Sequence, residues 1–318
     1  MVISRTPFRI SFIGGGSDFK EYYQQDYGAV ISATIDKYVY LSMHPMFNNL
    51  GYHLKYSENE MVDTADKIKH PIIREVFKEY DIPCVDFNST ADIPSGTGLG
   101  SSSSFTVGLI NLCGAYKKWF MAKSSIAYEA SKTEIDKLKS PIGKQDQYAS
   151  AFGGLNYIRF NSDDSVLLEK IKLSGYKRFE LENSLILFYL GGTRSSSSVL
   201  LEQKGNILSN SPVLKKMVNL VEELKTELNN NSIDNFGKIM HEGWMYKKEL
   251  SSNVSNPTID AFYEKALKNG AEGGKLLGAG NGGFLLLYSR NLERLRTNMK
   301  IYELSFEFED FGTTIIYQ

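Results

Sequence analysis

Residues 92–105 read DIPSGTGLGSSSSF and run without a break into an apolar segment. The apolar positions Phe105, Leu109, Leu112 and Tyr116 recur at spacings of three and four, which predicts a largely buried helix that begins inside the glycine-serine stretch. A flexible linker does not lead straight into such a helix. The stretch is therefore interpreted as a glycine turn at a helix N-terminus, where unpaired N–H groups and a partial positive charge favour phosphate.

Two common nucleotide-binding patterns do not fit this turn. A Walker A loop has a lysine directly after its last glycine, and none of Gly96, Gly98 or Gly100 is followed by lysine. The dinucleotide-binding pattern has a third glycine where Ser101 stands. A serine-capped helix after a glycine turn fits the residues as well as a phosphate site does, so the residues alone leave both interpretations open.

Strand and helix patterns occur in runs along the chain, without strict alternation. The first 60 residues alternate apolar and polar side chains and predict strands around one short helix, and residues 155–173 predict a hairpin. This mixture favours an α+β fold over a doubly wound sheet. We place a domain boundary near residue 170, which divides the chain into residues 1–170 and 171–318. Predicted helices of the second part cover residues 197–204, 211–229, 233–250 and 257–269.

Composition excludes several classes of function. The chain has 318 residues, 42% hydrophobic and 23% charged, as is typical of a soluble globular protein, and its formal net charge of -1 provides no basic field for nucleic acid. Cys84 and Cys113 lack metal-ligand spacing, and the four histidines are interpreted as structural. No window approaches 18 apolar residues, and the N-terminus lacks a signal-peptide pattern, so we expect a cytoplasmic protein without a membrane span.

Three collinear motifs together resemble the GHMP kinase family, which includes galactokinases and mevalonate kinases. They are RTPFRISFIGGGSD at residues 5–18, PSGTGLGSS at 94–102, and KLLGAGNGGFLLLY at 275–288. The resemblance implies an N-terminal ATP-binding domain like domain 2 of ribosomal protein S5 and a ferredoxin-like C-terminal domain. It also implies that ATP binds at the glycine-serine loop, through Pro94, Ser95, Gly96, Thr97, Gly98, Leu99, Gly100, Ser101, Ser102 and Ser103.

The resemblance further implies a Mg²⁺ site formed by Ser102 and Glu134. Magnesium prefers oxygen ligands and usually takes one or two protein groups, so this pair suits it. Taken without the motifs, Glu134 reads as a solvated helix carboxylate near Lys132 and Lys137.

Two further residues fall at the family's catalytic positions. The resemblance implies that Asp146 accepts the proton of the attacking hydroxyl or orients it, and that Arg9 stabilises developing charge and keeps Asp146 a carboxylate. Considered alone, Asp146 reads as an acid at a helix N-terminus, and Arg9 as a surface arginine of a strand.

The first motif indicates a sugar acceptor. Galactokinase-like chains read Gly-Glu-His-Thr-Asp at this point, whereas this chain reads Gly14-Gly-Gly-Ser-Asp18. The retained aspartate is expected to accept hydrogen bonds from sugar hydroxyls, with Gly15, Gly16 and Ser17 beside it. A turn followed by a helix N-cap explains the same residues equally well.

Within the family, the first motif together with KQDQY and GGTRSSSS resembles the branch that phosphorylates the anomeric hydroxyl of D-glycero-D-manno-heptose 7-phosphate, a step toward nucleotide-activated heptose for surface polysaccharide. An acceptor that already carries phosphate needs a second anion site. We assign this site to Arg194, Ser195 and Ser196, with Lys144 and Lys275 as further candidates, and place Gly280 of the third motif beside the acceptor. A serine-capped helix with a surface arginine is an equal alternative at 194–197.

Two other functions remain open at this point. One is a kinase for an unphosphorylated sugar such as fucose, galactose or an N-acetylhexosamine, which would not need the second anion site. The other is a catalytically silent sensor of sugar or nucleotide, although such a protein need not keep Arg9, Ser102, Glu134 and Asp146 together. The expected partners are ATP and a sugar phosphate, and the expected assembly is a monomer or a homodimer.

Overall fold

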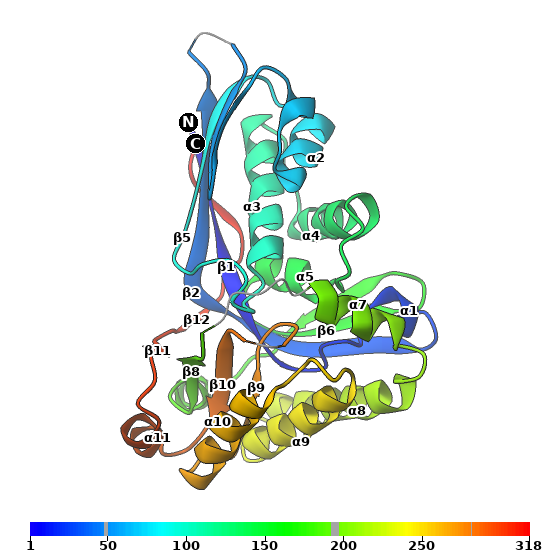
Figure 1. Cartoon of the computed structure of the whole chain (residues 1–318), viewed down its shortest axis with the longest axis vertical. Coiled ribbons are helices and arrows are strands. Elements are labelled where there is room, and N and C mark those ends of the chain that lie inside the picture. Colours follow the sequence, from blue (N-terminus) through cyan, green and yellow to red (C-terminus); the bar gives the residue numbers. More distant parts are fainter. Residues whose placement is uncertain (48–49, 192–196, 281) are drawn as a thin grey trace.

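The computed structural model describes residues 1–47, 50–191, 197–280 and 282–318, which form two β-sheets with helices packed against them (Figure 1). The larger sheet has the strand order β13-β1-β2-β5-β3-β4; β12 and β6 also pair with β2, and β7 pairs with β6. Its strands are β1 (Val2–Ile13), β2 (Tyr27–Pro45), β3 (Tyr52–Lys55), β4 (Asn59–Val62), β5 (Val85–Ala91), β6 (Leu155–Asn161), β7 (Val166–Lys170), β12 (Phe308–Glu309) and β13 (Thr314–Tyr317).

Strand β2 organises this sheet because its two halves pair with different strands. Residues 27–33 pair antiparallel with β6, and residues 39–45 pair antiparallel with β5. Strand β1 pairs antiparallel with β2 along most of the length of β1. Among the described residues, β3 and β5 form the only parallel pair. The sheet is therefore not doubly wound, and the prediction of an α+β fold is confirmed.

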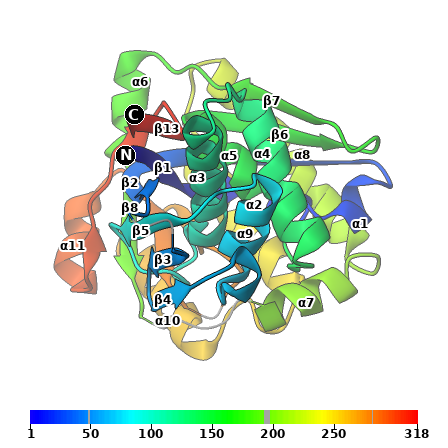
Figure 2. The same ribbon diagram turned by 90° about the horizontal axis from the view of Figure 1, so that it is seen from above.

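Helix α3 packs directly on β1 and β2. A Cβ at Gly108 would lie 2.7 Å from Thr6 Oγ1, so the glycine allows close approach, and the Ser4 hydroxyl donates to the Gly108 carbonyl at 3.0 Å. Figure 2 shows α3, α4 and α5 grouped over the sheet when it is viewed from above. The helices of this half are α1 (Lys20–Tyr23), the 3₁₀ helix η1 (Ala65–Lys67), α2 (Pro71–Glu79), α3 (Ser101–Tyr116), α4 (Lys123–Ser131), the π-helix η2 (Lys132–Lys137) and α5 (Gln145–Phe152).

The smaller sheet has the strand order β11-β8-β10-β9. Helix α9 packs against β9 so closely that a Cβ at Gly273 would lie 1.8 Å from the Gly237 carbonyl oxygen. The elements of this half are α6 (Gly175–Glu182), β8 (Leu185–Tyr189), α7 (Ser197–Gly205), α8 (Ser211–Asn229), α9 (Phe236–Glu249), α10 (Pro257–Lys268), β9 (Gly273–Leu276), β10 (Phe284–Tyr288), α11 (Leu292–Met299) and β11 (Glu303–Leu304).

The two halves share buried side chains. The Phe12 ring of β1 and the Phe236 ring of α9 lie 5.1 Å apart between centroids. The last strands, β12 and β13, return to the larger sheet, so the two ends of the chain lie close together (Figure 1). The domain boundary near residue 170 stays a prediction.

Most predicted elements are confirmed, including the hairpin of β6 and β7 and the helices α7, α8, α9 and α10. Two α-helices of the described chain were missed. α6 buries only Leu181, and α11 buries only Leu295 and Met299, which is too few apolar positions for a clear helical period. No helix within the described ranges is long and apolar enough to cross a bilayer.

Candidate active site

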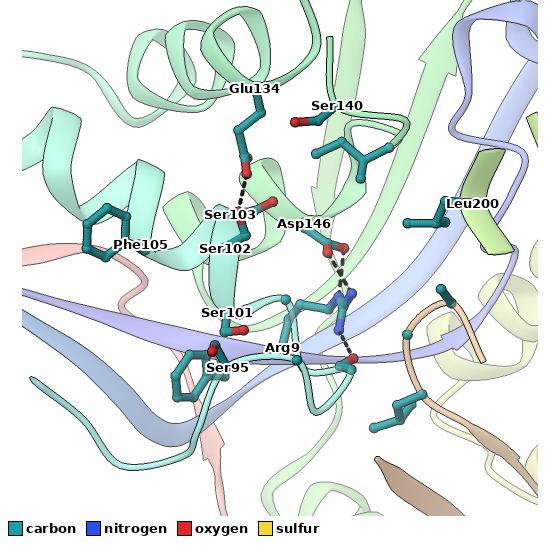
Figure 3. Close-up of a pocket in the computed structure, with 18 of the residues that line it drawn as sticks. Arg9, Ser95, Ser101, Ser102, Ser103, Phe105, Glu134, Ser140, Asp146 and Leu200 are labelled. Carbon is teal, nitrogen blue, oxygen red and sulfur yellow. Dashed lines mark hydrogen bonds and ion pairs between the residues drawn. The ribbon is translucent and has the colours of Figure 1, made fainter. Parts of the chain in front are cut away.

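A cavity of about 880 Å³ lies where the three motifs meet, although they are far apart in the sequence. The loop after β1, the loop before α3, the N-terminal part of α5, and the loop between β9 and β10 contribute to its walls (Figure 3). Its volume lies within the range of sites that enclose small-molecule ligands. The cavity is therefore the candidate active site.

Glycines determine the path of the loop before α3. Gly96, Gly98 and Gly100 have φ angles of 78°, 90° and 76°, in the left-handed region that disfavours side chains. A Cβ at Gly98 would also lie 2.6 Å from the Leu277 carbonyl oxygen, so this glycine lets the loop contact the third motif. Gly100 is the N-cap of α3, and Ser101, Ser102 and Ser103 of the first turn line the cavity. The N–H groups of this turn have no acceptors within the helix, and they lie at the cavity wall.

Eight of the ten residues predicted to bind ATP line the cavity, and Thr97 and Leu99 do not. The Thr97 hydroxyl donates to the Pro94 carbonyl at 3.1 Å, and the Leu99 carbonyl accepts a hydrogen bond from the Arg9 N–H at 3.1 Å. Both side chains are buried. These two residues thus hold the shape of the loop, while their neighbours face the cavity.

Ser102 and Glu134, the predicted metal ligands, are in contact. The Ser102 hydroxyl donates to Glu134 Oε1 at 2.7 Å (Figure 3). The Gln147 amide donates to Glu134 Oε2 at 2.7 Å. Glu134 is 1% exposed, and burial raises the pKa of its carboxyl. A buried carboxylate beside a hydroxyl at a cavity wall matches the oxygen ligands of Mg²⁺, whose remaining positions are usually filled by phosphate and water. The residues present therefore fit a magnesium ion.

Arg9 and Asp146 form a bidentate ion pair. Arg9 Nε lies 2.7 Å from Asp146 Oδ1, and Nη2 lies 2.6 Å from Oδ2 (Figure 3). Arg9 Nη1 donates to the Gly98 carbonyl at 2.7 Å, which joins the pair to the glycine-serine loop. The Asp146 side chain keeps 21% exposure, whereas that of Arg9 is 6% exposed. The aspartate is thus fixed in orientation and still accessible from the cavity.

Asp18 is the second carboxylate at this end of the cavity. Its Oδ1 accepts the Gly16 N–H at 2.9 Å, and its Oδ2 accepts the backbone N–H and side-chain amide of Gln145 at 3.2 and 3.0 Å. A Cβ at Gly143 would lie 2.1 Å from Oδ2, so the glycine makes room for this carboxylate. Burial, and the nearby charge of Asp146, raise the pKa of Asp18.

Lys247 and Lys275 also line the cavity and are buried, at 6% and 4% exposure. Lys247 Nζ donates to the Gly278 carbonyl at 2.6 Å. Burial lowers the pKa of Lys247 to about 8, and burial together with Lys247 and Arg9 lowers the pKa of Lys275 well below its usual range. Since the charges of Arg9, Asp18 and Asp146 act on both lysines, the two lysines lie at the same end of the cavity as the two aspartates.

Several buried polar atoms of the cavity wall have no hydrogen-bond partner within the described part of the chain. They are Ser11 Oγ, Gln145 Oε1 and Gln203 Nε2. A buried polar group without a partner costs free energy unless a ligand or water satisfies it. These atoms, a hydroxyl, an acceptor and a donor, suit a ligand rich in hydroxyl groups.

The other end of the cavity has an aromatic wall. The Tyr56 and His70 rings lie 4.9 Å apart between centroids, and His70 and Phe105 lie 5.2 Å apart. Burial lowers the pKa of His70, which favours the neutral ring. His70 was interpreted as structural, and it does cap α2, but it also lines the cavity. Apolar and aromatic side chains of this kind suit a nucleotide base.

Not all predicted acceptor residues line the cavity. Gly15, Gly16, Asp18, Lys275 and Gly280 do. The other predicted acceptor residues are Ser17 and Lys144, treated next, and Arg194, Ser195 and Ser196, which lie outside the described residues.

Two predicted acceptor contacts differ in the structure. The Ser17 hydroxyl is fully buried and bonds to the backbone of Gly14 and Ala29, so it holds the loop. Lys144 Nζ lies 2.6 Å from Asp164 Oδ1, and Lys144 is not among the cavity residues. Neither Ser17 nor Lys144 lines the cavity.

Several cavity residues were missed from the sequence, among them the polar residues Ser11, Gln145, Gln203 and Lys247. Gln145 stands next to Asp146 in the quoted KQDQY stretch, which was a usable signal. Lys247 and Gln203 lie on helices α9 and α7, where polar residues are common, so nothing in the local pattern marked them.

Two family models match the chain. The model described as GHMP kinases N terminal domain matches residues 66–154, and the model described as GHMP kinases C terminal matches residues 209–302. Together they cover more than half of the chain.

Individual relatives agree with these matches. The chain is 28% identical to D-glycero-alpha-D-manno-heptose 7-phosphate kinase of Campylobacter jejuni, over 90% of this chain and 88% of the relative. It is 25% identical to a galactokinase of Thermosipho africanus, over 92% of each chain. A solved structure described as a D-glycero-D-manno-heptose 1-phosphate kinase from Bacteroides thetaiotaomicron superimposes with a TM-score of 0.81 at 23% identity, covering 100% of both chains.

Proposed function

Because this chain belongs to the GHMP kinase family, we propose that it transfers the γ-phosphate of ATP to the anomeric hydroxyl of D-glycero-D-manno-heptose 7-phosphate. The product would be the 1,7-bisphosphate. Anomeric phosphates serve as precursors of nucleotide-activated sugars, so we place the reaction on a route to activated heptose for surface polysaccharide.

One observation carries the proposal: the Arg9–Asp146 pair and the Ser102–Glu134 pair lie in one cavity, joined by the glycine-serine loop. The first pair can act on an acceptor hydroxyl, and the second can hold Mg²⁺ beside the phosphates. Phosphoryl transfer depends mainly on positioning and electrostatic stabilisation of this kind.

ATP fits the cavity in a defined direction. Its phosphates would lie at the glycine turn and the N-terminus of α3, and its base would lie toward the aromatic wall of Tyr56, His70 and Phe105. When bound, Mg²⁺ would neutralise phosphate charge and favour departure of ADP. Ser102 and Glu134 are the residues that would hold it.

The acceptor hydroxyl would lie against Asp146. As its oxygen forms the bond to the γ-phosphorus, the O–H bond breaks and its proton passes to the Asp146 carboxylate. The bond between the γ-phosphorus and the bridging oxygen breaks, and ADP leaves with that electron pair. Arg9 holds both oxygens of Asp146 during this step and adds positive charge where negative charge develops.

Asp18 and Gln145 would hold the sugar ring. Oδ1 and Oδ2 of Asp18 already accept three N–H groups, so the carboxylate can accept one sugar hydroxyl, and Gln145 Oε1 is an acceptor without a partner inside the described residues. The backbone of Gly15 and Gly16 lies at the same wall, without side chains that would occupy the space. The acceptor is therefore a polyhydroxylated ring in this proposal.

The test is ADP release with Mg-ATP against heptose 7-phosphate, the same heptose without phosphate, fucose and galactose. We expect turnover with the phosphorylated heptose, and ³¹P NMR should show a new phosphate at C1. Turnover only with a free sugar would replace this acceptor with that sugar, consistent with the similarity to galactokinase. Absence of turnover with every acceptor, together with a ligand-induced rise in Tm, would indicate a sensor and refute the kinase assignment.

A further inference from the structure

We propose that Lys247 of α9 and Lys275 of β9 form the site for the phosphate that the acceptor sugar already carries. This inference rests on the proposed function, because it assumes a phosphorylated acceptor. It keeps Lys275, a further candidate from the sequence, adds Lys247, and does not use residue 194 and its neighbours, on which the sequence-based assignment centred.

The two lysines come from neighbouring elements of the smaller sheet and face one cavity. Helix α9 packs against β9, and both lysines line the cavity at less than a tenth of full exposure. Lys247 Nζ donates to the Gly278 carbonyl at 2.6 Å and lies 3.4 Å from the Leu276 carbonyl, so its position is fixed beside the third motif. Its ammonium has three N–H donors, and at least one stays available.

Neither ammonium is neutralised within the described part of the chain. No ion pair there includes Lys247 or Lys275, and the Lys275 ammonium makes no hydrogen bond there. The carboxylates that act on both lysines, Asp18 and Asp146, already bond to Gln145 and Arg9. Two buried cations without a carboxylate partner are costly to keep unless an anion binds between them.

The local charge balance favours a phosphate. With every group charged, Arg9, Lys247 and Lys275 would carry three positive charges against the two negative charges of Asp18 and Asp146, an excess of one positive charge that a bound anion would offset. Burial and repulsion from Arg9 lower the pKa values of both lysines, and repulsion from Lys247 lowers that of Lys275 as well. A phosphate dianion would remove the repulsion and restore both charges.

The location favours the acceptor's phosphate over the phosphates of ATP. The ATP phosphates have the glycine turn, the α3 N-terminus and the Ser102–Glu134 pair, all in the N-terminal half. The lysines belong to the C-terminal half, and the charges that act on them are those of Arg9, Asp18 and Asp146, the groups assigned to the acceptor. A sugar held by Asp18 would therefore have its own phosphate within reach of the lysines.

The test uses Lys275→Met and Lys247→Met, which keep chain length and remove charge. The measured quantity is the ratio of kcat/KM for heptose 7-phosphate to kcat/KM for the same heptose without phosphate. We expect each substitution to lower this ratio about 10- to 100-fold, as for loss of a hydrogen bond to a charged group. Lys248→Met is the matched control, because Lys248 lies next along α9, contacts Asp260 at 3.3 Å and does not line the cavity.

A second measurement separates binding from folding. Lys275→Met should leave the Tm of the free protein unchanged or higher, because it removes a buried charge without a partner, while the rise in Tm caused by heptose 7-phosphate should shrink. Lys275→Arg should restore part of that rise, since it restores the charge.

The outcomes are distinguishable. If the wild-type protein prefers the phosphorylated heptose and the methionine variants keep that preference, the proposed function stands and the lysine assignment is overturned. A rise in KM for ATP with an unchanged acceptor ratio would also overturn it, because the lysines would then act on the transferred phosphate. If the wild-type protein itself shows no preference for a phosphorylated acceptor, the proposed function fails first.

Discussion

Replacing Asp146 with asparagine tests the catalytic assignment most directly. Asparagine has the same shape, but one carboxylate oxygen becomes an amide NH₂ group that faces an Arg9 N–H, donor against donor. The substitution therefore removes the proton acceptor and one of the two Arg9 bonds, while the cavity keeps its size. The bond from Arg9 Nη1 to the Gly98 carbonyl is retained, so the glycine-serine loop should keep its position.

The size of the effect follows from the role of the carboxylate. A positioned general base contributes about 10²- to 10⁴-fold, so kcat should fall by that factor, equivalent to about 3 to 5 kcal/mol in the activation barrier. The KM for ATP should change little, because Asp146 is assigned to the acceptor. Stability should fall by about 1 to 3 kcal/mol, because Arg9 is buried and loses one charged acceptor.

The assay is steady-state ADP release with saturating acceptor, with urea unfolding measured in parallel to separate lost catalysis from lost folding. Asp164→Asn is the matched control, since Asp164 also pairs with a basic side chain, Lys144 at 2.6 Å, but does not line the cavity. A folded Asp146→Asn protein that keeps kcat within a fewfold of the wild-type value would refute the role of Asp146 as proton acceptor.

Three further predictions concern the metal ligand, the loop and the lysine charge. Glu134→Gln should raise the Mg²⁺ concentration for half-maximal ADP release about tenfold or more, and an unchanged Mg²⁺ titration would remove Glu134 from the metal site. Gly98→Ala should lower the free energy of unfolding, measured in urea, by about 1 to 3 kcal/mol, because φ is 90° and the added Cβ would lie 2.6 Å from the Leu277 carbonyl oxygen. Gly175 has open space around it, so Gly175→Ala should not lower the free energy of unfolding. The pKa of Lys247 is lowered to about 8, so this lysine is charged below pH 8 and neutral above it. The kcat/KM for a phosphorylated acceptor should therefore decline as the pH rises through 8. A kcat/KM that stays constant up to about pH 10 would contradict this. The charged groups that face Lys247 in this titration are Arg9, Asp18, Asp146 and Lys275.

The glycine-serine turn was predictable because its information is local. Apolar spacing after residue 104 indicated a buried helix, and the glycines indicated a left-handed backbone, since both depend on residues within a few positions. The structure has α3 begin at Ser101 with positive φ at Gly96, Gly98 and Gly100. The strand pairing of β6 and β7 was predictable for the same reason, because a short turn joins the two strands.

Helices α6 and α11 mark the limit of periodicity. Each buries only one or two side chains, because most of its surface faces solvent, and the pattern that would reveal it is therefore absent. Their helical structure depends on the elements they contact more than on their own residues.

The contacts of the site required tertiary structure. Arg9 and Asp146 are 137 positions apart, and whether Arg9 is a surface residue or the partner of Asp146 depends on how β1 and α5 pack. The contact between Ser102 and Glu134 also depends on tertiary packing, because the sequence alone would place the Glu134 carboxylate in solvent.

By itself, the sequence of this protein determined the α+β class, the glycine turn at the start of a helix, and the three motifs that indicate an ATP-dependent kinase. Only the tertiary structure decided that Lys247 and Lys275 are buried together, that Lys144 bonds to Asp164, and that Gln145 supports Asp18. The physical reason is that backbone conformation depends on neighbouring residues, whereas burial and charge pairing depend on which distant surfaces the fold brings into contact.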